Sequence, residues 1–435
     1  MSRILLAALA AAASIALVAP AGAETVAITN AHIYSMGPAG EIASGTVVIT
    51  NGKIASVGAS ATIPAGARVI DAHGQVVTPG LVATNTPLST VEVSEGVSET
   101  DDNATASAKL SAAFDLQYAI NPDSILIPTA RLGGITDAIV TPTLGRDRNR
   151  RDMLFAGQAA AIQLGAGTEM LRRPRIGMVL IMGEEGAKLA GGSRAAEMVL
   201  IRAMLEDVRS YAKNKAAYDQ GRTRAYALSH EDLEALIPVV DGREPLMVSV
   251  HRAADIRQVL QLGREEKLKL ILEGAEEGWM VAPEIAAAHV PVLLSGFEDL
   301  PSSFDRIAAT LENSARLNAA GVTVAIENPP IYQGGRTPRI DAGRAVAHGL
   351  PFDAALASIT INPARIWGVD DKVGSLTPGK DADVVVWSGD PLEPLSAPTA
   401  VIIKGVEQPL RDRDLDLRDR YLKAGNGYPS QYDQP

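Results

Sequence analysis

Six histidines and no cysteine limit the chemistry that this chain of 435 residues can perform. The absence of cysteine excludes disulfides, iron–sulfur clusters, zinc–thiolate sites and cysteine nucleophiles. One histidine, His251, directly follows the apolar run 246–250, which predicts a strand. Active sites of α/β barrels lie at the C-terminal ends of their strands, so His251 is a candidate functional residue, with a hydrogen-bonded packing role as the alternative. The other histidines are predicted to be structural or exposed: His32, His73, His230, His289 and His348.

A run of arginines follows another predicted strand, 135–140. Guanidinium groups bind carboxylates in a bidentate manner, so this loop is a candidate site for an acidic substrate or a peptide C-terminus. Asp147 and Asp152 interrupt the run, which favours the alternative of a self-neutralised surface loop. No Walker loop, Rossmann fingerprint or G-x-S-x-G elbow occurs between a predicted strand and a predicted helix, where each of these motifs would have to lie. The arginines of this loop are Arg146, Arg148, Arg150 and Arg151.

The elements that must position these residues are short apolar runs that alternate with helical patterns. Such alternation is typical of a parallel sheet built from right-handed βαβ units. A closed barrel needs about eight strands, so one more is expected between 143 and 244, where a helical insertion near 193–238 also lies. The runs already visible are 76–83, 135–140, 176–182, 246–250, 268–272, 290–294 and 322–326.

Segments with strand patterns flank this region at both ends of the chain, and each end is too small to bury a core alone. The two ends are therefore expected to pair in one β-sandwich. The predicted strands are 25–36, the two strands of a hairpin at 45–57 with its turn at Asn51-Gly52, and 68–72 before the barrel, and 383–387 and 400–404 after it. The predicted fold is α/β: a TIM-like (β/α)8 barrel at 80–372, a discontinuous β-sandwich domain at 24–79 plus 373–410, and a charged tail at 411–435.

The N-terminus has the pattern of a cleaved secretory signal peptide over residues 1–23, with Arg3, an apolar run and the small residues Ala21 and Ala23. Cleavage before Glu24 would change the net charge from -11 to about −12, which argues against nucleic acid or an anionic membrane as partner. No later segment has spanning length, so no stable membrane insertion is expected after cleavage. We predict an exported protein, in the periplasm of a Gram-negative bacterium.

Three motifs carry a family resemblance: VTPGL at 77–81, INPAR at 361–365 and GSLTPGKDAD at 374–383. With them the chain resembles the amidohydrolase superfamily, in its imidazolonepropionase-like and prolidase-like branch, over nearly the whole mature chain. The resemblance implies a metal-dependent TIM-like barrel that hydrolyses carbon–nitrogen bonds in amides, lactams or cyclic imides. Fold membership alone does not carry the chemistry.

The resemblance also implies a set of metal ligands, which this sequence keeps only in part. His251 matches the histidine of the fifth strand, and Glu184 resembles an acidic ligand after the third strand, with a loop carboxylate in water as the alternative. Glu327, or Asn328 after a register shift, stands near the place of the last-strand aspartate, as ligand or base. Glu273 is nearby, but alternation points its side chain to the face opposite that of residue 274. The positions where the family ligands are lost are Asn85, Pro87, Gly274 and Pro329.

Two hypotheses follow. In the first, the chain is an exported hydrolase of carbon–nitrogen bonds in which His251, Glu184 and Glu327 hold one zinc, manganese or iron ion that activates water. The alternative is a catalytically silent relative without metal that binds a small molecule or a partner protein in the barrel mouth. The first hypothesis requires the donor atoms of these side chains to converge within about 2–3 Å of one point. The expected ligand is a small amide, a lactam or an acidic peptide-like molecule, and a homo-oligomer stays open.

Overall fold

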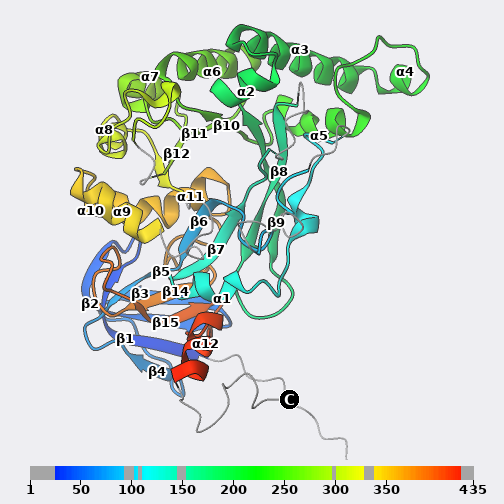
Figure 1. Ribbon diagram of the computed structural model, residues 1–435. Helices are drawn as coiled ribbons and strands as arrows, with labels where there is room; N and C mark the ends of the chain where they lie inside the picture. The colour runs from blue at the N-terminus through cyan, green and yellow to red at the C-terminus, as the bar shows by residue number, and fades with distance from the viewer. Residues whose placement is uncertain are drawn as a thin grey trace, which may run out of the picture.

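The computed structural model describes residues 25–92, 102–105, 110–144, 153–295, 300–327 and 338–422. It contains two sheets of eight strands each (Figure 1). One sheet curls into a nearly closed barrel, so the predicted α/β class with a TIM-like barrel is confirmed. The barrel strands, in their order around the sheet, are β6 (Leu81–Thr86), β7 (Ile135–Val140), β8 (Phe155–Gln163), β9 (Leu171–Ile181), β10 (Leu246–Val250), β11 (Leu270–Gly274), β12 (Val292–Leu294) and β13 (Val324–Ile326).

The strand that the sequence pattern left unassigned is β8, and it lies inside the predicted interval 143–244. It differs from the expected parallel arrangement because it pairs antiparallel with both β7 and β9. Only residues 164–170 separate β8 from β9, and a parallel crossover needs about a dozen residues or more. A short hairpin therefore reverses the strand, while β9 to β13 pair in parallel.

The barrel is closed by chain outside its strands. In the described ranges no ladder joins β13 to β6; instead the Val82 amide donates to the Ile359 carbonyl at 2.9 Å, and Asn362 Nδ2 donates to the Val324 carbonyl at 2.8 Å. Asn362 lies in α11 (Ile361–Ile366), and Trp367 after it donates from its indole to Thr84 Oγ1 inside the barrel at 2.8 Å. The inward side chains that fill the barrel with Trp367 are Val82, Ile139, Val179, Met247, Ile271, Leu293 and Ala325.

The second sheet is built from both ends of the described chain. Its order is β16-β15-β14-β5-β1-β2-β3, with β4 on β1. The chain passes from this sheet into the barrel at Gly80. A Cβ at this position would lie 2.0 Å from Thr136 Oγ1, so only glycine fits. The predicted run 76–83 thus contains two strands, one in each sheet. The predicted domain boundaries stay predictions. The strands are β1 (Thr25–Tyr34), β2 (Glu41–Thr50), β3 (Lys53–Gly58), β4 (Arg68–Asp71), β5 (Val76–Pro79), β14 (Val384–Trp387), β15 (Pro398–Ile403) and β16 (Val406–Glu407).

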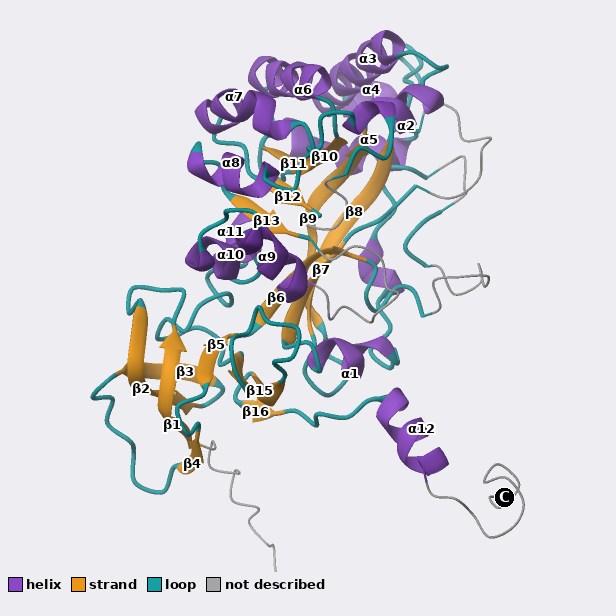
Figure 2. Ribbon diagram, turned by 60° about the vertical axis from the view of Figure 1, so that its left-hand side comes forward, coloured by secondary structure: helices purple, strands orange, loops and turns teal. Residues whose placement is uncertain are grey.

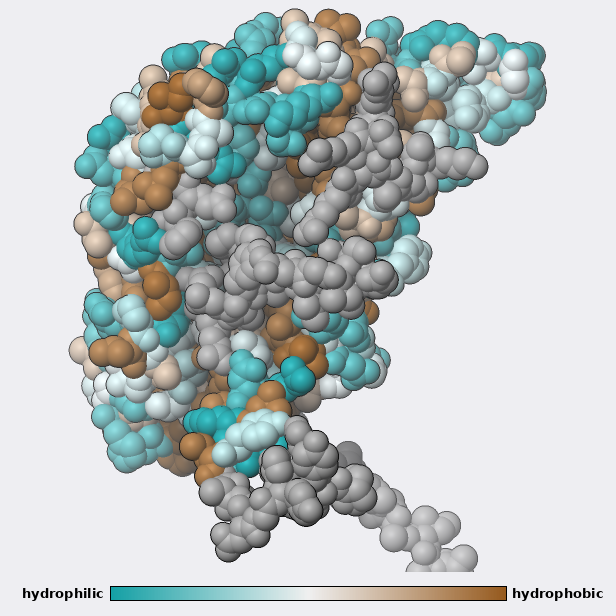
Figure 3. Space-filling view, viewed as in Figure 1, coloured by the Kyte–Doolittle hydropathy of each residue, from teal (hydrophilic) through white to brown (hydrophobic). Residues whose placement is uncertain are grey.

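Most helices gather at the end of the barrel away from the second sheet (Figures 1 and 2). The predicted insertion forms α3 to α5, and the tip of this region has a largely hydrophilic surface (Figure 3). Within the described ranges, no helix combines the length and apolarity that a membrane crossing requires. The helices are α1 (Leu126–Arg131), α2 (Gly183–Leu189), α3 (Arg194–Lys213), α4 (Lys215–Asp219), α5 (His230–Val240), α6 (Ala253–Glu266), α7 (Ala282–Ala287), α8 (Asn313–Ala319), α9 (Pro338–Ala347), α10 (Phe352–Ser358), α11 and α12 (Arg413–Leu422).

A buried acidic side chain, Glu197, lies where α3 packs against α2. A Cβ on Gly186 would lie 2.0 Å from its Oε1, so only glycine fits there. That oxygen has no hydrogen-bond partner within the described part of the chain. Burial, with the charges of Asp255 and Asp305, raises the pKa of Glu197 to about 8. The side chain is therefore protonated at neutral pH.

We expect Glu197→Gln to change how stability depends on pH. The folded-state pKa of about 8 exceeds the ordinary 4.5, so the folded chain holds a proton that the unfolded chain releases. The free energy of unfolding therefore falls as the pH rises through this window. The glutamine variant should lack this loss, on the order of 2 kcal/mol between about pH 5 and pH 8.5, measured by urea unfolding. The same loss in both proteins would contradict the prediction.

Candidate functional site

The C-terminal ends of the barrel strands bring together a histidine, a glutamate and an arginine. His251 follows β10, Glu276 follows β11, and Arg306 ends the 3-10 turn Phe304–Arg306. His251 Nδ1 lies 2.7 Å from Glu276 Oε2, and Arg306 Nη1 lies 3.0 Å from Glu276 Oε1. Arg306 Nη2 lies 3.5 Å from His251 Nε2. The side chains of His251 and Glu276 are only 14% and 5% exposed, so the pair is shielded from water.

The partners of the ring define its protonation. A carboxylate at Nδ1 keeps a proton on that nitrogen, and the Nε2 lone pair of the neutral ring then faces Arg306. Burial lowers the pKa of His251, but the hydrogen bond and charge of Glu276 and the charge of Glu273 outweigh it, and the pKa is raised. The result is an imidazole that is oriented like a general base and binds a second proton more readily than a free imidazole does.

Gly274 makes room for this ring. Its φ is +83°, and a Cβ at this position would lie 2.5 Å from His251 Nδ1. The position at which the resemblance places a second histidine is therefore filled by the ring of His251. A side chain at residue 274 and His251 in its present position exclude one another.

Glu273 lies closer to the site than the sequence suggested. Its side chain does point away from the side of Gly274, as alternation predicts, but that direction is the barrel interior, which Ile271 on the same strand also faces. The Ser249 hydroxyl donates to the Glu273 carboxylate, and burial raises the pKa of Glu273. Glu273 is thus a second carboxyl group whose charge acts on His251.

The first-strand position aligned with a family histidine carries a hydrogen-bonded amide. Asn85 Nδ2 donates to Glu327 Oε2 at 2.8 Å, and Asn85 Oδ1 accepts from the Thr141 hydroxyl at 2.6 Å. Both functional groups of the amide are therefore engaged, and they tie the last strand to the first two. Pro87 lies in the turn after β6, where its carbonyl accepts from the Thr90 amide at 2.9 Å.

Glu184 is not brought to this site. It lies in the first turn of α2, its side chain is 46% exposed, and its Oε1 lies 3.1 Å from Lys188 Nζ. Only its backbone amide faces inward, donating to Asp305 Oδ2 at 2.7 Å. The arrangement corresponds to the alternative of a carboxylate in water, because the side chain is half exposed and pairs with Lys188. The arginine loop at 146–151, the signal sequence at 1–23, and Asn328 and Pro329 lie outside the described residues.

A divalent metal does not fit the donors that this structure describes. No group of three or more His, Asp or Glu side chains that could hold an ion occurs in the described ranges, so the predicted convergence of His251, Glu184 and Glu327 is not found. His251 bonds a carboxylate through one nitrogen and faces a guanidinium with the other. A cation at Nε2 would repel Arg306 at close range. We therefore derive no catalytic step through a metal at these residues.

The sequence prediction missed Glu276 and Arg306. Glu276 left a weak signal, since it opens a pair of acidic residues two positions after a strand, and both members of the pair are buried. Burial of adjacent carboxylates at a strand end is unusual without bonding partners. Arg306 left no signal, because its segment between β12 and α8 has no periodic pattern.

We expect Gly274→Ala to displace His251 and destabilise the fold. The substitution combines a left-handed backbone with the clash at Nδ1, at a cost of about 2–4 kcal/mol. Gly321→Ala is a matched control, because its φ is +88° and no atom lies within 4 Å of its Cβ position. Urea unfolding of both variants separates the clash from the backbone strain. Equal losses in the two variants would show that His251 can move away freely.

Comparisons with known proteins agree with this architecture. The model of the amidohydrolase family matches residues 263–408. The amidohydrolase tasK of Hapsidospora irregularis is 24% identical over an alignment of 380 residues, which covers 79% of this chain but only 37% of that relative. This chain therefore spans little more than a third of that relative's length.

Solved structures extend the likeness to nearly the whole described chain. An amidohydrolase from Thermotoga maritima MSB8 superposes with a TM-score of 0.78 at 25% identity, covering 89% of this chain and 100% of its own. A prolidase in complex with N-methylphosphonate-L-proline shares the fold, with a TM-score of 0.53 at 13% identity over 88% of this chain and 99% of its own. The family model over residues 263–408, the relative and the fold together support the amidohydrolase superfamily for this chain.

Proposed function

We propose that this chain hydrolyses a carbon–nitrogen bond at the barrel mouth, with His251 as general base. The observation that carries the proposal is the buried His251–Glu276 pair, 2.7 Å apart, at the end of the barrel where superfolds of this kind place their chemistry. Membership of a hydrolase family supports the reaction class. The donor set supports a mechanism that does not depend on a metal.

Each residue has a distinct part in this reaction. His251 Nε2 takes a proton from a water molecule while the water oxygen attacks the substrate carbonyl carbon. Glu276 holds the Nδ1 proton and stabilises the imidazolium, and the positive charge of Arg306 faces the negative oxygen of the tetrahedral intermediate. The imidazolium then returns its proton to the leaving nitrogen as the carbon–nitrogen bond breaks, which gives a carboxylate and an amine after loss of the acid proton.

The substrate class follows from the same arrangement. Without metal polarisation, the chemistry favours an activated carbonyl such as that of a lactam or a cyclic imide over an unstrained amide. The loop with Arg146, Arg148, Arg150 and Arg151 remains a proposed site for a substrate carboxylate. Acidic lactams, acidic cyclic imides and acidic dipeptides are therefore the first compounds to test.

The test is a hydrolysis screen on purified mature chain with and without a chelator. We expect turnover of at least one member of this panel that persists in EDTA, in protein with less than about 0.1 metal ion per chain. Activity that is lost with a chelator and restored by zinc or manganese would overturn the mechanism. The mechanism would also be overturned if the active protein carries one metal ion per chain that EDTA does not remove.

A second candidate is a silent relative that binds the same class of ligand. The observation that favours it is the closure of the family ligand positions, since Asn85 bonds Glu327 and the ring of His251 occupies the space beside Gly274. This candidate predicts that a panel member raises the melting temperature without being consumed. Stabilisation together with product release supports hydrolysis instead.

We also propose export through the N-terminal signal, supported by the pattern at 1–23. Expression of the full chain in a Gram-negative host should yield periplasmic protein that begins at Glu24 by N-terminal sequencing. Cytoplasmic protein that retains Met1 would contradict export.

A further inference from the structure

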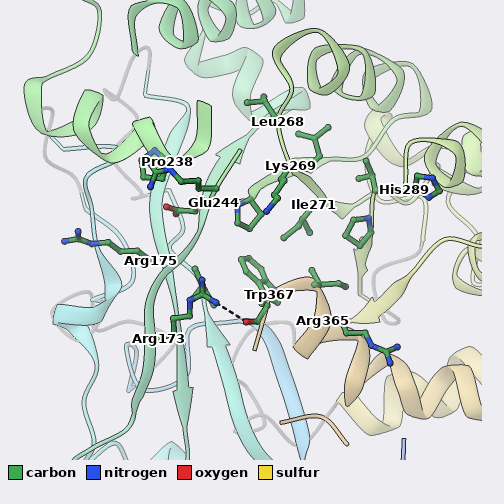
Figure 4. A pocket seen from close by; sticks show the side chains of 18 of the residues that line it. Arg173, Arg175, Pro238, Glu244, Leu268, Lys269, Ile271, His289, Arg365 and Trp367 are labelled. Atoms are coloured by element: carbon green, nitrogen blue, oxygen red, sulfur yellow. Dashed lines mark hydrogen bonds between the residues drawn. The ribbon is translucent and has the colours of Figure 1, made fainter. Parts of the chain in front are cut away.

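A large cavity lies at the N-terminal face of the barrel, opposite His251. Its volume is about 820 Å³, which is within the range of small-molecule sites. Pro245, Lys269 and Pro291 line it, and they immediately precede β10, β11 and β12. Since these strands are parallel, this face and the His251 site lie at opposite ends of the barrel. Trp367 and Ile271 contribute an apolar wall (Figure 4).

The lining is strongly basic in a chain whose net charge is -11. Two of its arginines are neutralised: Arg175 Nε lies 2.7 Å from Asp115, and Arg243 Nη2 lies 2.9 Å from Asp241. Three cations remain without an ion pair to any described residue. Arg173 donates only to the Gly368 carbonyl, at 3.0 Å, and Lys269 and Arg365 are exposed. The cavity therefore carries an excess of positive charge.

A buried polar atom in the cavity wall lacks a partner. Glu244 is 7% exposed and lines the cavity, and its Oε1 has no hydrogen-bond partner among residues that the structure describes. Figure 4 shows this side chain between Arg175 and the residues around Lys269. An unsatisfied buried oxygen costs stability unless a ligand or a proton satisfies it. This is the second, independent sign of a binding site here.

We propose that this cavity binds a small multivalent oxyanion that carries an apolar part, held by Arg173 and Lys269 with Glu244 as a hydrogen-bond donor. The guanidinium and ammonium groups supply the charge, and the wall formed by Trp367 and Ile271 accepts the apolar part. A phosphate ester and a polycarboxylate share this chemistry. The site is independent of the hydrolysis proposed at the other end of the barrel.

The role of Glu244 makes binding depend on pH. Burial raises the pKa of Glu244 to about 7, the charge of Asp115 adds to this, and Arg175, Arg173 and Arg243 oppose it. Below this pH the carboxyl group can donate to an anion. Above it, the carboxylate repels the anion, so affinity falls as the pH rises.

Isothermal titration of the mature chain with pyrophosphate and with citrate tests the proposal. We expect at least one anion to bind with a Kd below about 1 mM at constant ionic strength. Arg173→Ala with Lys269→Ala should weaken binding at least about tenfold. Lys213→Ala with Arg222→Ala removes the same charge from the exposed insertion and should leave binding unchanged. Binding of pyrophosphate alone indicates a phosphate ligand, and binding of citrate alone indicates a carboxylate ligand.

Three further variants make the test decisive. Lys269→Ala alone removes an exposed side chain, so a loss of affinity in this variant is not a folding defect. Glu244→Gln should reduce the fall in affinity between about pH 6 and pH 8 severalfold, and the titration of the anion itself cancels in this comparison. Glu276→Gln, at the other face of the barrel, should leave the affinity for the anion unchanged. Absence of binding by either anion at about 5 mM, or equal affinity in the cavity double variant and wild type, would overturn the proposal.

Discussion

His251→Ala is expected to lower kcat for hydrolysis by about 10²–10⁴-fold with a small change in KM, because general acid–base catalysis contributes in this range. The ring takes part mainly in the proton transfers of the transition state, so its loss should spare substrate binding. His73→Ala is the matched control, since that side chain is 80% exposed and lies in the turn between β4 and β5 of the second sheet. Steady-state kinetics of both variants on the same substrate measure the effect. Full activity in His251→Ala would remove this histidine from the mechanism.

Glu276→Gln is expected to shift the pH dependence of kcat/KM, which would not change if Glu276 only supported the fold. The carboxylate raises the pKa of His251, and the base must be neutral to act, so activity rises with pH through that pKa. Without the carboxylate, the pKa falls and the rising limb of kcat/KM moves to lower pH, while kcat itself drops. A lower rate with an unmoved limb would mean that Glu276 only supports the fold.

The barrel was predictable from local patterns, except for one strand, which the pattern left unassigned between 143 and 244 and whose direction it did not predict. Apolar runs between helical segments mark parallel strands, and the run at 246–250 coincides with β10. The β8 segment Phe155–Gln163 mixes small and apolar residues with two glutamines, and such a segment has the same pattern whether it runs parallel or antiparallel. Its direction depends on the length of the connection to β9, a feature that a strand pattern does not contain.

Residues of the site could be predicted only where they occupy positions that align with the metal ligands of the family. Asn85 and Gly274 occupy such positions, and the structure shows what each does there: one bonds Glu327, and the other admits a neighbouring ring. Arg306 comes from a segment more than 50 residues beyond His251 in the chain, and their proximity is a product of tertiary packing. No spacing rule connects residues that meet only through the fold.

A single buried cation joins the barrel to the second sheet. Arg172 of β9 contacts three carboxylates: Asp137 through Nε, Asp381 through Nη1, and Asp383 through Nη2 at 2.8 Å. Asp137 belongs to β7, whereas Asp381 and Asp383 lead into β14 of the second sheet. The arginine and all three aspartate side chains are at most 8% exposed. Burial, with the charges of Asp137 and Asp381, raises the pKa of Asp383, so the cluster depends on its cation.

Arg172→Met is expected to destabilise the chain by about 3–5 kcal/mol, because it leaves the buried Asp137 and Asp383 without a counter-charge, whereas Asp381 keeps Lys53. Methionine keeps most of the volume of the side chain. Arg173→Met on the same strand is the control: that side chain is exposed and donates only to the Gly368 carbonyl, so its loss should cost less than about 1 kcal/mol. In Arg172→Met the carboxylates would hold protons in the folded state that the unfolded chain releases, so the deficit should shrink as the pH falls from about 8 to about 5. Urea unfolding at both pH values tests this. An equal cost for the two substitutions, or a deficit that grows on acidification, would show that the cluster does not hold the two sheets together.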